Sequence, residues 1–444
     1  MTSRYIEIRP DNIPSNGKIS FKNGFPVLSF TISAQNGLLD PSTIRIVGNF
    51  SAYKDNLAVP TTLQDGDNVT MNNRLGIYNL FESLTIRSNR SKMVCENIRH
   101  YSKFMNTYLA CTSSLQDQLG HLAQSCLIVP NATTFRKNVM ESPDAVGQTN
   151  PFSMHIPSGF LQSGNMVNLR DDAFGGLQIE FLLQPDSNVL YNTDADTTGI
   201  GDAHYEISNL KLTCEISDMP ANQPPQSEGA YDFNTITSLY TSINSTNAQI
   251  QYNLALRNVI SAYMTFLPAA NINTLTQDGQ ATIPLTGTST NNASLAKIKR
   301  VQYLKGGVKY PADFDYVSNT ENATNGATTV MDPVMIKNLV EAVSPDKDYS
   351  LERLSLSKAN VNRLFDGRTG ASVASSYMNC PEGGVVYGLA VKYGIGEAGE
   401  DFSTEQWGVS IDSDLTADHP QGVYIFIKSR AQMLYSSNGI QLLQ

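Results

Sequence analysis

The chain has 444 residues, which is enough for two or three domains, and 41% of them are hydrophobic, which is enough to fill large buried cores. This composition excludes a disordered tail and a disulfide-stapled miniprotein. Only 16% of the residues are charged, and 31 Lys and Arg against 41 Asp and Glu give a net charge of −10, which argues against a surface devoted mainly to nucleic acid.

The N-terminal sequence MTSRYIEI lacks the basic segment and the apolar stretch that define a secretory signal. No apolar run approaches the roughly 20 residues that span a bilayer. The five cysteines form no CxxC pair and have no histidine at metal-ligand spacing. We therefore expect a soluble protein made in a reducing compartment, with cysteines that act as small buried apolar groups. They are Cys95, Cys111, Cys126, Cys214 and Cys380.

Short strands are predicted throughout the first half of the chain. In Leu177–Gln184, apolar residues alternate with mostly polar neighbours, a period of two that places one face of a strand on a core. Leu210–Ile216 repeats this pattern more strictly. The other predicted strands of this half are 18–21, 27–33, 44–47 and 83–87.

A composition break separates the two halves. Asp218–Gly229 contains three prolines and no apolar periodicity, which is typical of a semi-rigid, extended spacer. We therefore divide the chain into an N-terminal domain at 1–217, a Pro-rich linker at 218–229 and a C-terminal domain at 230–444.

The second half is predicted to be strand-rich as well. Its segments are rich in β-branched and aromatic residues and are bounded by turn residues. The predicted strands are 249–256, 261–267, 298–304, 309–316, 385–393, 407–411 and 423–428. Many short strands without strand–helix alternation predict a sandwich or barrel in each half.

Helices are expected to be few. Lys92–Thr112 has apolar residues at three- and four-residue steps, and Asp332–Val343 has the same pattern with a proline in its first turn. Long polar loops are predicted at 131–174, 192–204 and 271–296. Long loops on a β scaffold usually carry function or contact partners.

No catalytic motif is present. The histidines are isolated, and there is no HExxH motif, no nucleophile elbow and no phosphate-binding loop. We therefore expect no catalytic, cofactor-binding or metal-binding residues. The histidines are His100, His121, His155, His204 and His419.

Gly394–Gly399 matches G-x-G-x-x-G, but a dinucleotide site needs a helix at the third glycine. Here acidic residues and a further strand follow, so we interpret the segment as a loop. The acidic groups at 171–172, 194–196 and 412–418 lack the register of a calcium loop and are more typical of turns. The basic run Arg87–Lys92 is typical of a solvated face, with contact to anionic lipid or genome as the alternative.

Three motifs carry a resemblance to a known family. They are Tyr205–Leu212, the pair Ile250–Leu254 and Met264–Pro268, and Gly306–Pro311. By their order and spacing, the chain resembles the double jelly-roll major capsid proteins of icosahedral double-stranded DNA viruses. Within that group it is most similar to those of polinton-like viruses and virophages, with adenovirus and tectivirus proteins more distant.

The resemblance implies an all-β fold of two consecutive eight-stranded jelly-roll sandwiches, with a few short helices in loops. It implies a structural protein of the virion, not an enzyme, with no cofactor and no specific small-molecule ligand. Homotrimers with a pseudo-hexameric outline would tile the shell. They would contact neighbouring capsomers, penton proteins, minor or cement proteins and, on the inner face, an internal membrane or the genome.

Under this interpretation, apolar loop residues that are exposed on a monomer would lie in the trimer interface. The candidates are Phe160, Leu161, Phe174 and Tyr191. The alternative is that each of them is an ordinary anchor packed on its own domain.

Two other function classes stay open. A two-domain carbohydrate-binding or adhesin-like protein would favour a signal peptide and exposed aromatic clusters, whereas Trp407 is the only tryptophan. A β-sandwich hydrolase would use two carboxylates that only folding brings together.

Overall fold

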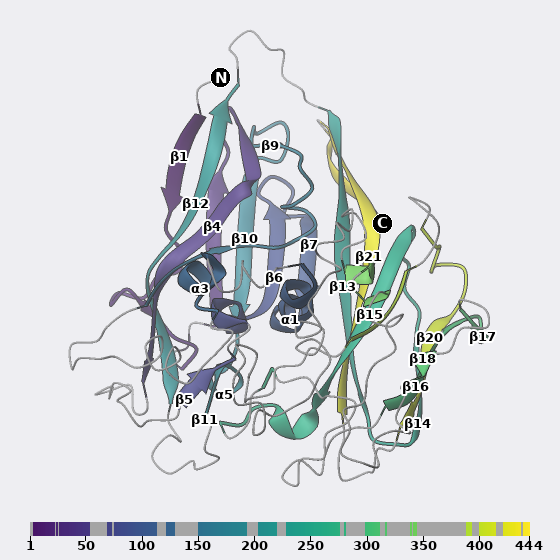
Figure 1. The fold of residues 1–444 in the computed structure, drawn as a ribbon. Helices are drawn as coiled ribbons and strands as arrows, with labels where there is room; N and C mark the ends of the chain where they lie inside the picture. The colour runs from purple at the N-terminus through teal and green to yellow at the C-terminus, as the bar shows by residue number, and fades with distance from the viewer. Residues whose placement is uncertain are drawn as a thin grey trace.

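The computed structural model shows two β-sandwiches side by side, the N-terminal one in purple and blue and the C-terminal one in green and yellow (Figure 1). The structure describes residues 3–22, 24, 26–53, 69–72, 75–112, 121–128, 150–192, 203–219, 228–275, 279–280, 298–310, 316–317, 338–339, 341–343, 388–392, 399–413, 421–436 and 438–444.

The first sandwich consists of two antiparallel sheets. One has the order β1 (Ser3–Ile8), β12 (His204–Asp218), β4 (Gly37–Tyr53) and β8 (Asn150–His155). The other has the order β3 (Val27–Ser33), β10 (Gly176–Leu183), β6 (Phe81–Ser88) and β7 (Val94–Arg99). Short strands extend the framework: β2 (Lys18–Ile19), β5 (Val69–Met71), β9 (Val167–Asn168) and β11 (Leu190–Asn192).

The second sandwich repeats this plan. One sheet has the order β13 (Gly229–Ile243), β21 (Gln421–Ser436), β15 (Val259–Pro268) and β19 (Gly388–Lys392). The other has the order β14 (Asn247–Tyr252), β20 (Trp407–Ser413), β16 (Ile298–Lys305) and β17 (Val308–Lys309). In addition, β18 (Tyr316–Val317) pairs with β16, and β22 (Gly439–Leu443) pairs with β21.

The two sandwiches share one strand order. When the eight principal strands of each half are numbered along the chain, the first sheet runs first, eighth, third, sixth, and the second runs second, seventh, fourth, fifth. This order is that of a jelly roll, in which Greek-key connections join two facing antiparallel sheets. The chain is therefore a double jelly roll, which confirms the predicted fold class.

Alternation along the strands builds each core. In β10, Leu177, Ile179 and Phe181 are buried, and the Phe181 ring lies 4.7 Å from that of Phe81 on β6. In the second roll, the Trp407 ring stacks on Phe402 at 3.8 Å and is 1% exposed. Every strand predicted from the sequence overlaps an observed strand. The strands that had not been predicted are β1, β5, β7, β8, β9, β11, β13 and β22.

The helix predicted over Lys92–Thr112 is wrong in its first third. Residues Val94–Arg99 form strand β7, and α1 spans only Tyr101–Thr112. Between them, His100 has a left-handed backbone (φ 53°), which turns the chain from strand to helix. Val94 and Ile98 fit a strand period as well as a helical one, so the pattern did not separate the two.

The remaining helices are short: η1 (Gly76–Leu80), α3 (His121–Cys126), α5 (Asp186–Val189) and η2 (Ala269–Asn271). In the predicted helix at 332–343, residues 338–339 and 341–343 are helical and the others lie outside the described residues. The loop predicted at 131–174 is wrong in part, because it contains β8 and β9. Of the loops predicted at 192–204 and 271–296, residues 193–202, 276–278 and 281–296 lie outside the described ones, as do residues 220–227 of the linker.

Candidate functional site at the junction of the two sandwiches

Two edge strands meet at the junction of the rolls. Strand β7 is the last strand of its sheet and β13 the first of its own, and they lie side by side (Figure 1). In the described strands, β7 pairs with β6 and β13 pairs with β21, and no ladder joins β7 to β13. Exposed edges invite pairing with other chains, so covering each with the other removes two such sites.

Glu96 on β7 is a buried charged group at the junction of the halves. Its carboxylate oxygens accept hydrogen bonds from the backbone N–H groups of Gly159, at 3.2 Å, and Phe160, at 3.0 Å. The side chain of Ser158 and the backbone N–H of Ile236 on β13 also bond to it. Burial raises the pKa of Glu96 to about 6, and these hydrogen bonds oppose the shift. The carboxylate therefore holds the loop after β8 on β7, where Gly159 and Phe160 meet β13.

An aromatic cluster surrounds this contact. The Phe160 ring, from the loop after β8, stacks on Tyr231 at 4.7 Å and meets Phe233 edge-on at 5.3 Å. Phe174 packs on Tyr435 of β21, with ring centroids 5.4 Å apart. The Tyr231 hydroxyl donates to the carbonyl of Phe160 at 3.1 Å and lies 2.8 Å from the donor hydroxyl of Ser163. The cluster joins loops of the first roll to strands of the second.

Gly159 packs closely against the backbone of β13 across the junction. A Cβ built on this residue would lie 1.3 Å from the carbonyl oxygen of Asn234 on β13, so no side chain fits there. Glycine is therefore required at this position by the contact itself.

Helix α1 forms a second contact between the rolls. His100 lies 5.0 Å from the Tyr424 ring, and Phe104 lies 6.1 Å from Phe426. The Nδ2 of Asn106 donates to the carbonyl of Gln280 at 3.0 Å, and the buried Lys103 ammonium contacts the Gln280 side chain at 2.5 Å. This helix lies between the sandwiches and packs on both.

The predicted trimer-interface residues are buried within the chain. Phe160, Leu161, Phe174 and Tyr191 are all at most 4% exposed, so their assignment to the trimer interface is wrong. Phe160 and Phe174 anchor the contact between the rolls, a burial that the loop sequence does not reveal. The large apolar side chains that are exposed, among the described residues, lie elsewhere: Tyr5, Ile13, Val27, Met166, Leu182, Tyr240, Val308, Leu434 and Leu443.

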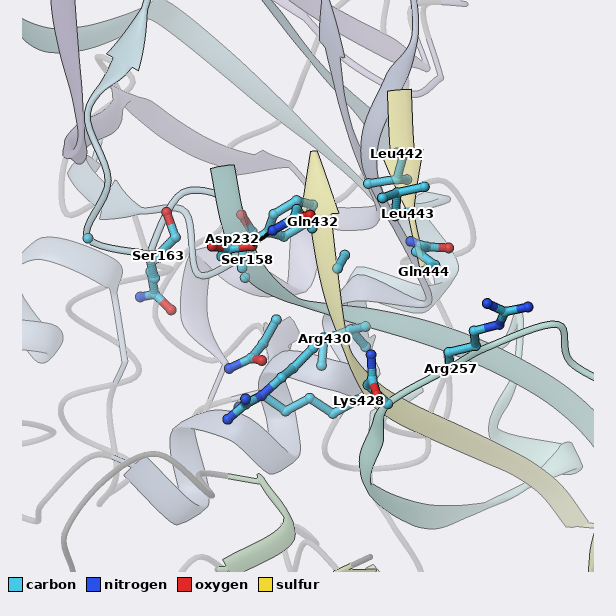
Figure 2. Close-up of a pocket in the computed structure, with 18 of the residues that line it drawn as sticks. Ser158, Ser163, Asp232, Arg257, Lys428, Arg430, Gln432, Leu442, Leu443 and Gln444 are labelled. Atoms are coloured by element: carbon cyan, nitrogen blue, oxygen red, sulfur yellow. Dashed lines mark hydrogen bonds between the residues drawn. The ribbon is translucent and has the colours of Figure 1, made fainter. Parts of the chain in front are cut away.

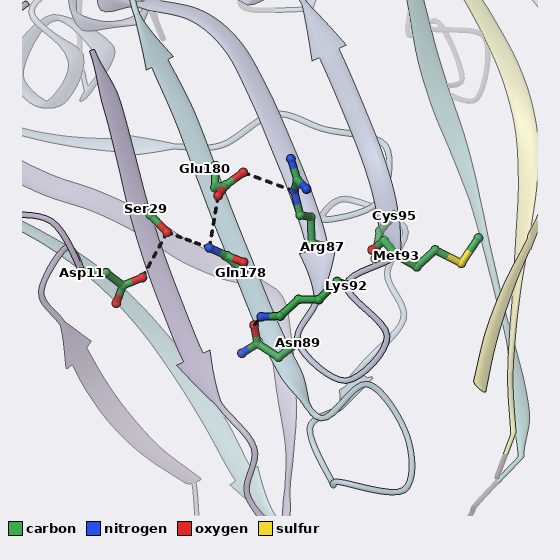
Figure 3. A network of polar contacts seen from close by, with 9 residues as sticks. All are labelled: Asp11, Ser29, Arg87, Asn89, Lys92, Met93, Cys95, Gln178 and Glu180. Atoms are coloured by element: carbon green, nitrogen blue, oxygen red, sulfur yellow. Dashed lines mark hydrogen bonds and ion pairs between the residues drawn. The ribbon is translucent and has the colours of Figure 1, made fainter. Parts of the chain in front are cut away.

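The basic run at 87–92 is largely engaged within the fold. Arg87 pairs with Glu180 at 3.2 Å in a polar network that crosses β6, β10 and β3 to reach Asp11 (Figure 3). Arg90 donates to the carbonyls of Asp172, at 2.6 Å, and Ser436, at 3.2 Å. The Arg90 contact is a further link between the rolls.

The histidines and acidic groups, for which the sequence predicted no catalytic or metal-binding role, have separate partners in the fold. His100 lies 2.9 Å from Glu82, and His204 stacks on Tyr53. Asp172 pairs with Arg170 at 2.9 Å. In the ranges that the structure covers, no three His, Cys, Asp or Glu side chains come together so as to hold a metal ion.

Glu400, after the glycine-rich segment, pairs with Lys305 at 2.9 Å, while Gly394–Ala398 lies outside the described residues. So do His419, Cys380, Asp194–Asp196 and the acidic positions from Asp414 to Asp418. Cys95, Cys126 and Cys214 are buried free thiols, as predicted, whereas Cys111 is a free thiol that is only partly buried.

A cleft of about 1450 Å³ opens beside the junction (Figure 2). One wall is the β13–β21 face, with Asp232, Lys428 and Arg430, and the other includes α1 and the loop at 158–164. Among its described lining residues, Asp232 is the one side-chain carboxylate, and it accepts a hydrogen bond from Gln432 at 2.8 Å. A carboxylate pair across the cleft, which glycoside hydrolysis needs, is not found there.

Sequence reasoning missed Glu96, Gly159 and the aromatic partners on β13. Glu96 stands next to Asn97 between the apolar residues Cys95 and Ile98, so its sequence context gave no distinct signal of burial. Trp407 is buried, so it offers no stacking platform for a sugar. No helix among the described residues meets the length and apolarity needed to cross a membrane.

The double jelly roll, with its rolls joined through β7 and β13, defines the structural class of the chain. No protein-family model matches the sequence, and no curated protein matches it. Solved structures of viral capsids match the fold over nearly its whole length.

The Sputnik virophage structure has a TM-score of 0.57 and 12% identity, covering 100% of this chain and 88% of that one. The PBCV-1 virus capsid has a TM-score of 0.56 and 11% identity, covering 100% and 96%. The Faustovirus major capsid protein has a TM-score of 0.56 and 9% identity, covering 98% and 90%. At these identities the likeness establishes a shared fold.

Proposed function

We propose that the chain is the major capsid protein of an icosahedral double-stranded DNA virus, a structural subunit of the virion and not an enzyme. The observation that carries the proposal is the duplication: two jelly rolls of identical strand order are joined edge to edge in one polypeptide. The fold is shared along nearly its whole length with capsid proteins of a virophage and of large viruses.

In this proposal three chains form a capsomer. Two similar rolls in each of three chains give six comparable units, and hence a pseudo-hexameric outline that can tile a flat facet. The exposed apolar side chains supply surface that neighbouring chains can bury. Neighbouring capsomers, penton proteins and minor or cement proteins complete the set of partners, with no cofactor.

The proposal also includes the domain division at 1–217, 218–229 and 230–444, with the linker as a spacer between rolls. We also propose that the inner face of the capsid contacts an internal membrane or the genome. Because Arg87 and Arg90 already bond within the fold, a polyanion at the 87–92 run would compete with those bonds.

Size determination of the purified protein tests the proposal. Light scattering after size exclusion is expected to give three times 48.5 kDa, with a hexagonal outline in negative-stain images. Apolar trimer interfaces of this kind resist dilution. A monomer at every concentration, or specific binding to a sugar array, would contradict a capsid role and favour the carbohydrate-binding alternative.

A further inference from the structure

The junction within the chain joins two particular edge strands. The fifth principal strand of the first roll, β7, lies beside the first strand of the second roll, β13. Tyr231 and Phe233 of β13, which pack on Phe160 of the first roll, are at most 5% exposed. The chain therefore joins its own rolls by placing a fifth strand beside a first strand.

The two other strands of this kind have no such neighbour within the chain. Among the described strands, β1, the first of the first roll, pairs with β12 alone, and β17, the fifth of the second roll, pairs with β16 alone. They lie on opposite flanks of the molecule (Figure 1). Because β1 and β17 are far apart in one chain, only a second copy can place them side by side.

Both of these edges carry apolar side chains that the chain leaves uncovered. Val308 on β17 is 69% exposed and Tyr5 on β1 is 63% exposed, the two highest values among the large apolar side chains of the described residues. No residue of β1 is buried, although Ile6 and Ile8 are apolar as well. Apolar surface of this kind at a strand edge favours contact with another protein surface.

The surroundings of Tyr5 and Val308 are compatible with burial. The carboxylate of Glu7 on β1 already accepts a hydrogen bond from Lys211 of its own chain at 2.6 Å, so covering β1 would not leave this charge unpaired. Beside β17, the backbone N–H of Gly306 donates to the carbonyl of Gln406 at 2.7 Å. This bond holds the exposed loop at 403–406 against the turn before β17, which extends the surface available to a neighbour.

We propose that β1 of each chain packs against β17 of the next chain in the trimer, with Tyr5 and Val308 buried in the contact. The inference rests on the proposed function and names the surfaces through which its copies associate. The contact joins two unlike surfaces, so it is heterologous, and three such contacts close a ring. Each contact between chains then repeats the arrangement of β7 and β13 within a chain, and the six rolls follow one another around the ring.

The first test uses the full chain and the variants Tyr5→Asp and Val308→Asp. Light scattering after size exclusion is expected to show monomers of each variant where the wild type is a trimer. The concentration needed for assembly is expected to rise at least about tenfold, because the new carboxylate would be buried without a partner. The matched control is Val27→Asp, since Val27 is a 40% exposed valine on β3, away from both edges, and its variant is expected to remain a trimer.

Mixing the two variants tests whether the contact joins unlike surfaces. The Tyr5→Asp chain keeps an intact β17 and the Val308→Asp chain keeps an intact β1, so one good contact can form between them. An equimolar mixture is therefore expected to give a species of twice 48.5 kDa, although each variant alone is a monomer. This recovery would also show that both variants are folded.

Trimers of either single variant, a mixture that stays monomeric, or an equal loss of assembly in Val27→Asp would overturn this inference and leave the proposed function standing. A mixture that stays monomeric would mean that the association uses identical surfaces or other parts of the chain. A wild type that is a monomer at every concentration would contradict the proposed function and, with it, the contact between β1 and β17.

Discussion

Glu96 shows how a single buried residue can fix a loop at the junction of two domains. A carboxylate 2% exposed to solvent would be unfavourable without partners, yet its oxygens accept hydrogen bonds from Gly159, Phe160 and Ile236. Its pKa is about 6 because the desolvation of the charge outweighs these bonds. This group makes the junction sensitive to pH.

The pKa of Glu96 is raised from 4.5 to about 6 on folding, so the folded state holds the proton more tightly. The contribution of this proton to the free energy of unfolding is fully present below pH 4.5 and is lost as the pH rises through about 6. This contribution is about 2 kcal/mol. We predict that Glu96→Gln reduces the pH dependence of the unfolding free energy by that amount. Urea unfolding at fixed protein concentration between pH 4.5 and 7 measures it.

Asp172→Asn is a control, because Asp172 affects the pH dependence of the unfolding free energy in the opposite direction to Glu96. The hydrogen bond from Arg170 lowers the pKa of Asp172, so its contribution is lost as the pH falls. Asp186, whose burial raises its pKa to about 6, adds to the wild-type dependence in the same direction as Glu96. An unchanged pH profile in Glu96→Gln would show that the carboxylate is not protonated at the junction.

At the scale of elements, strands were predictable where one face meets a core and the other meets solvent. Val27–Ser33 matches β3 at both ends because the buried apolar residues Leu28, Phe30 and Ile32 alternate with Ser29, Thr31 and Ser33 in the sequence. Strand β13 was missed because Tyr231 and Phe233 face the first roll amid Asn, Thr and Ser, so its pattern reflects two different surroundings. Strand β7 was missed because the spacing of its apolar residues Val94 and Ile98 fits a helical period as well as a strand period.

The contact of the 158–164 loop with β13 depends on the absence of a side chain at Gly159. We predict that Gly159→Ala separates the loop from β13, because the added Cβ would overlap the Asn234 carbonyl. The expected cost is several kcal/mol, in the range of severe overpacking. A large fall in the thermal midpoint, with increased protease cleavage between the rolls, is the readout.

Gly164→Ala supplies the comparison in the same loop. Gly164 has a left-handed backbone (φ 77°) with no atom near the position of a Cβ, so the change adds only backbone strain of about 1 kcal/mol. Similar losses in the two variants would mean that loop conformation, and not the close approach to β13, governs stability.

For the whole molecule, strand periodicity predicted a sandwich or barrel in each half, and the resemblance of short motifs to a known family specified the jelly roll. The strand order was beyond composition and periodicity, since β1 pairs with β12 about 200 residues away and only the folded chain brings them together. The same reason applies to the junction: the apolar character of Phe160 and Phe174 was visible, whereas their partners on β13 and β21 were not.

The two rolls are expected to unfold in one transition, because their contact buries aromatic side chains from both. We predict that Phe160→Ala lowers stability by about 3–5 kcal/mol and splits the calorimetric transition into two. Phe30→Ala, in the core of the first roll, is the matched control and is expected to destabilise without uncoupling. A single transition in Phe160→Ala would show that α1 couples the rolls without the aromatic cluster.

The shielding of β7 by β13 has a consequence for inheritance. Either half alone would expose an unpaired edge strand and the aromatic side chains that pack on the other half. Both features promote aggregation with other copies of the chain. Gene fragments encoding one half would therefore be selected against, and the duplicated arrangement, once acquired, would tend to pass from ancestor to descendant intact.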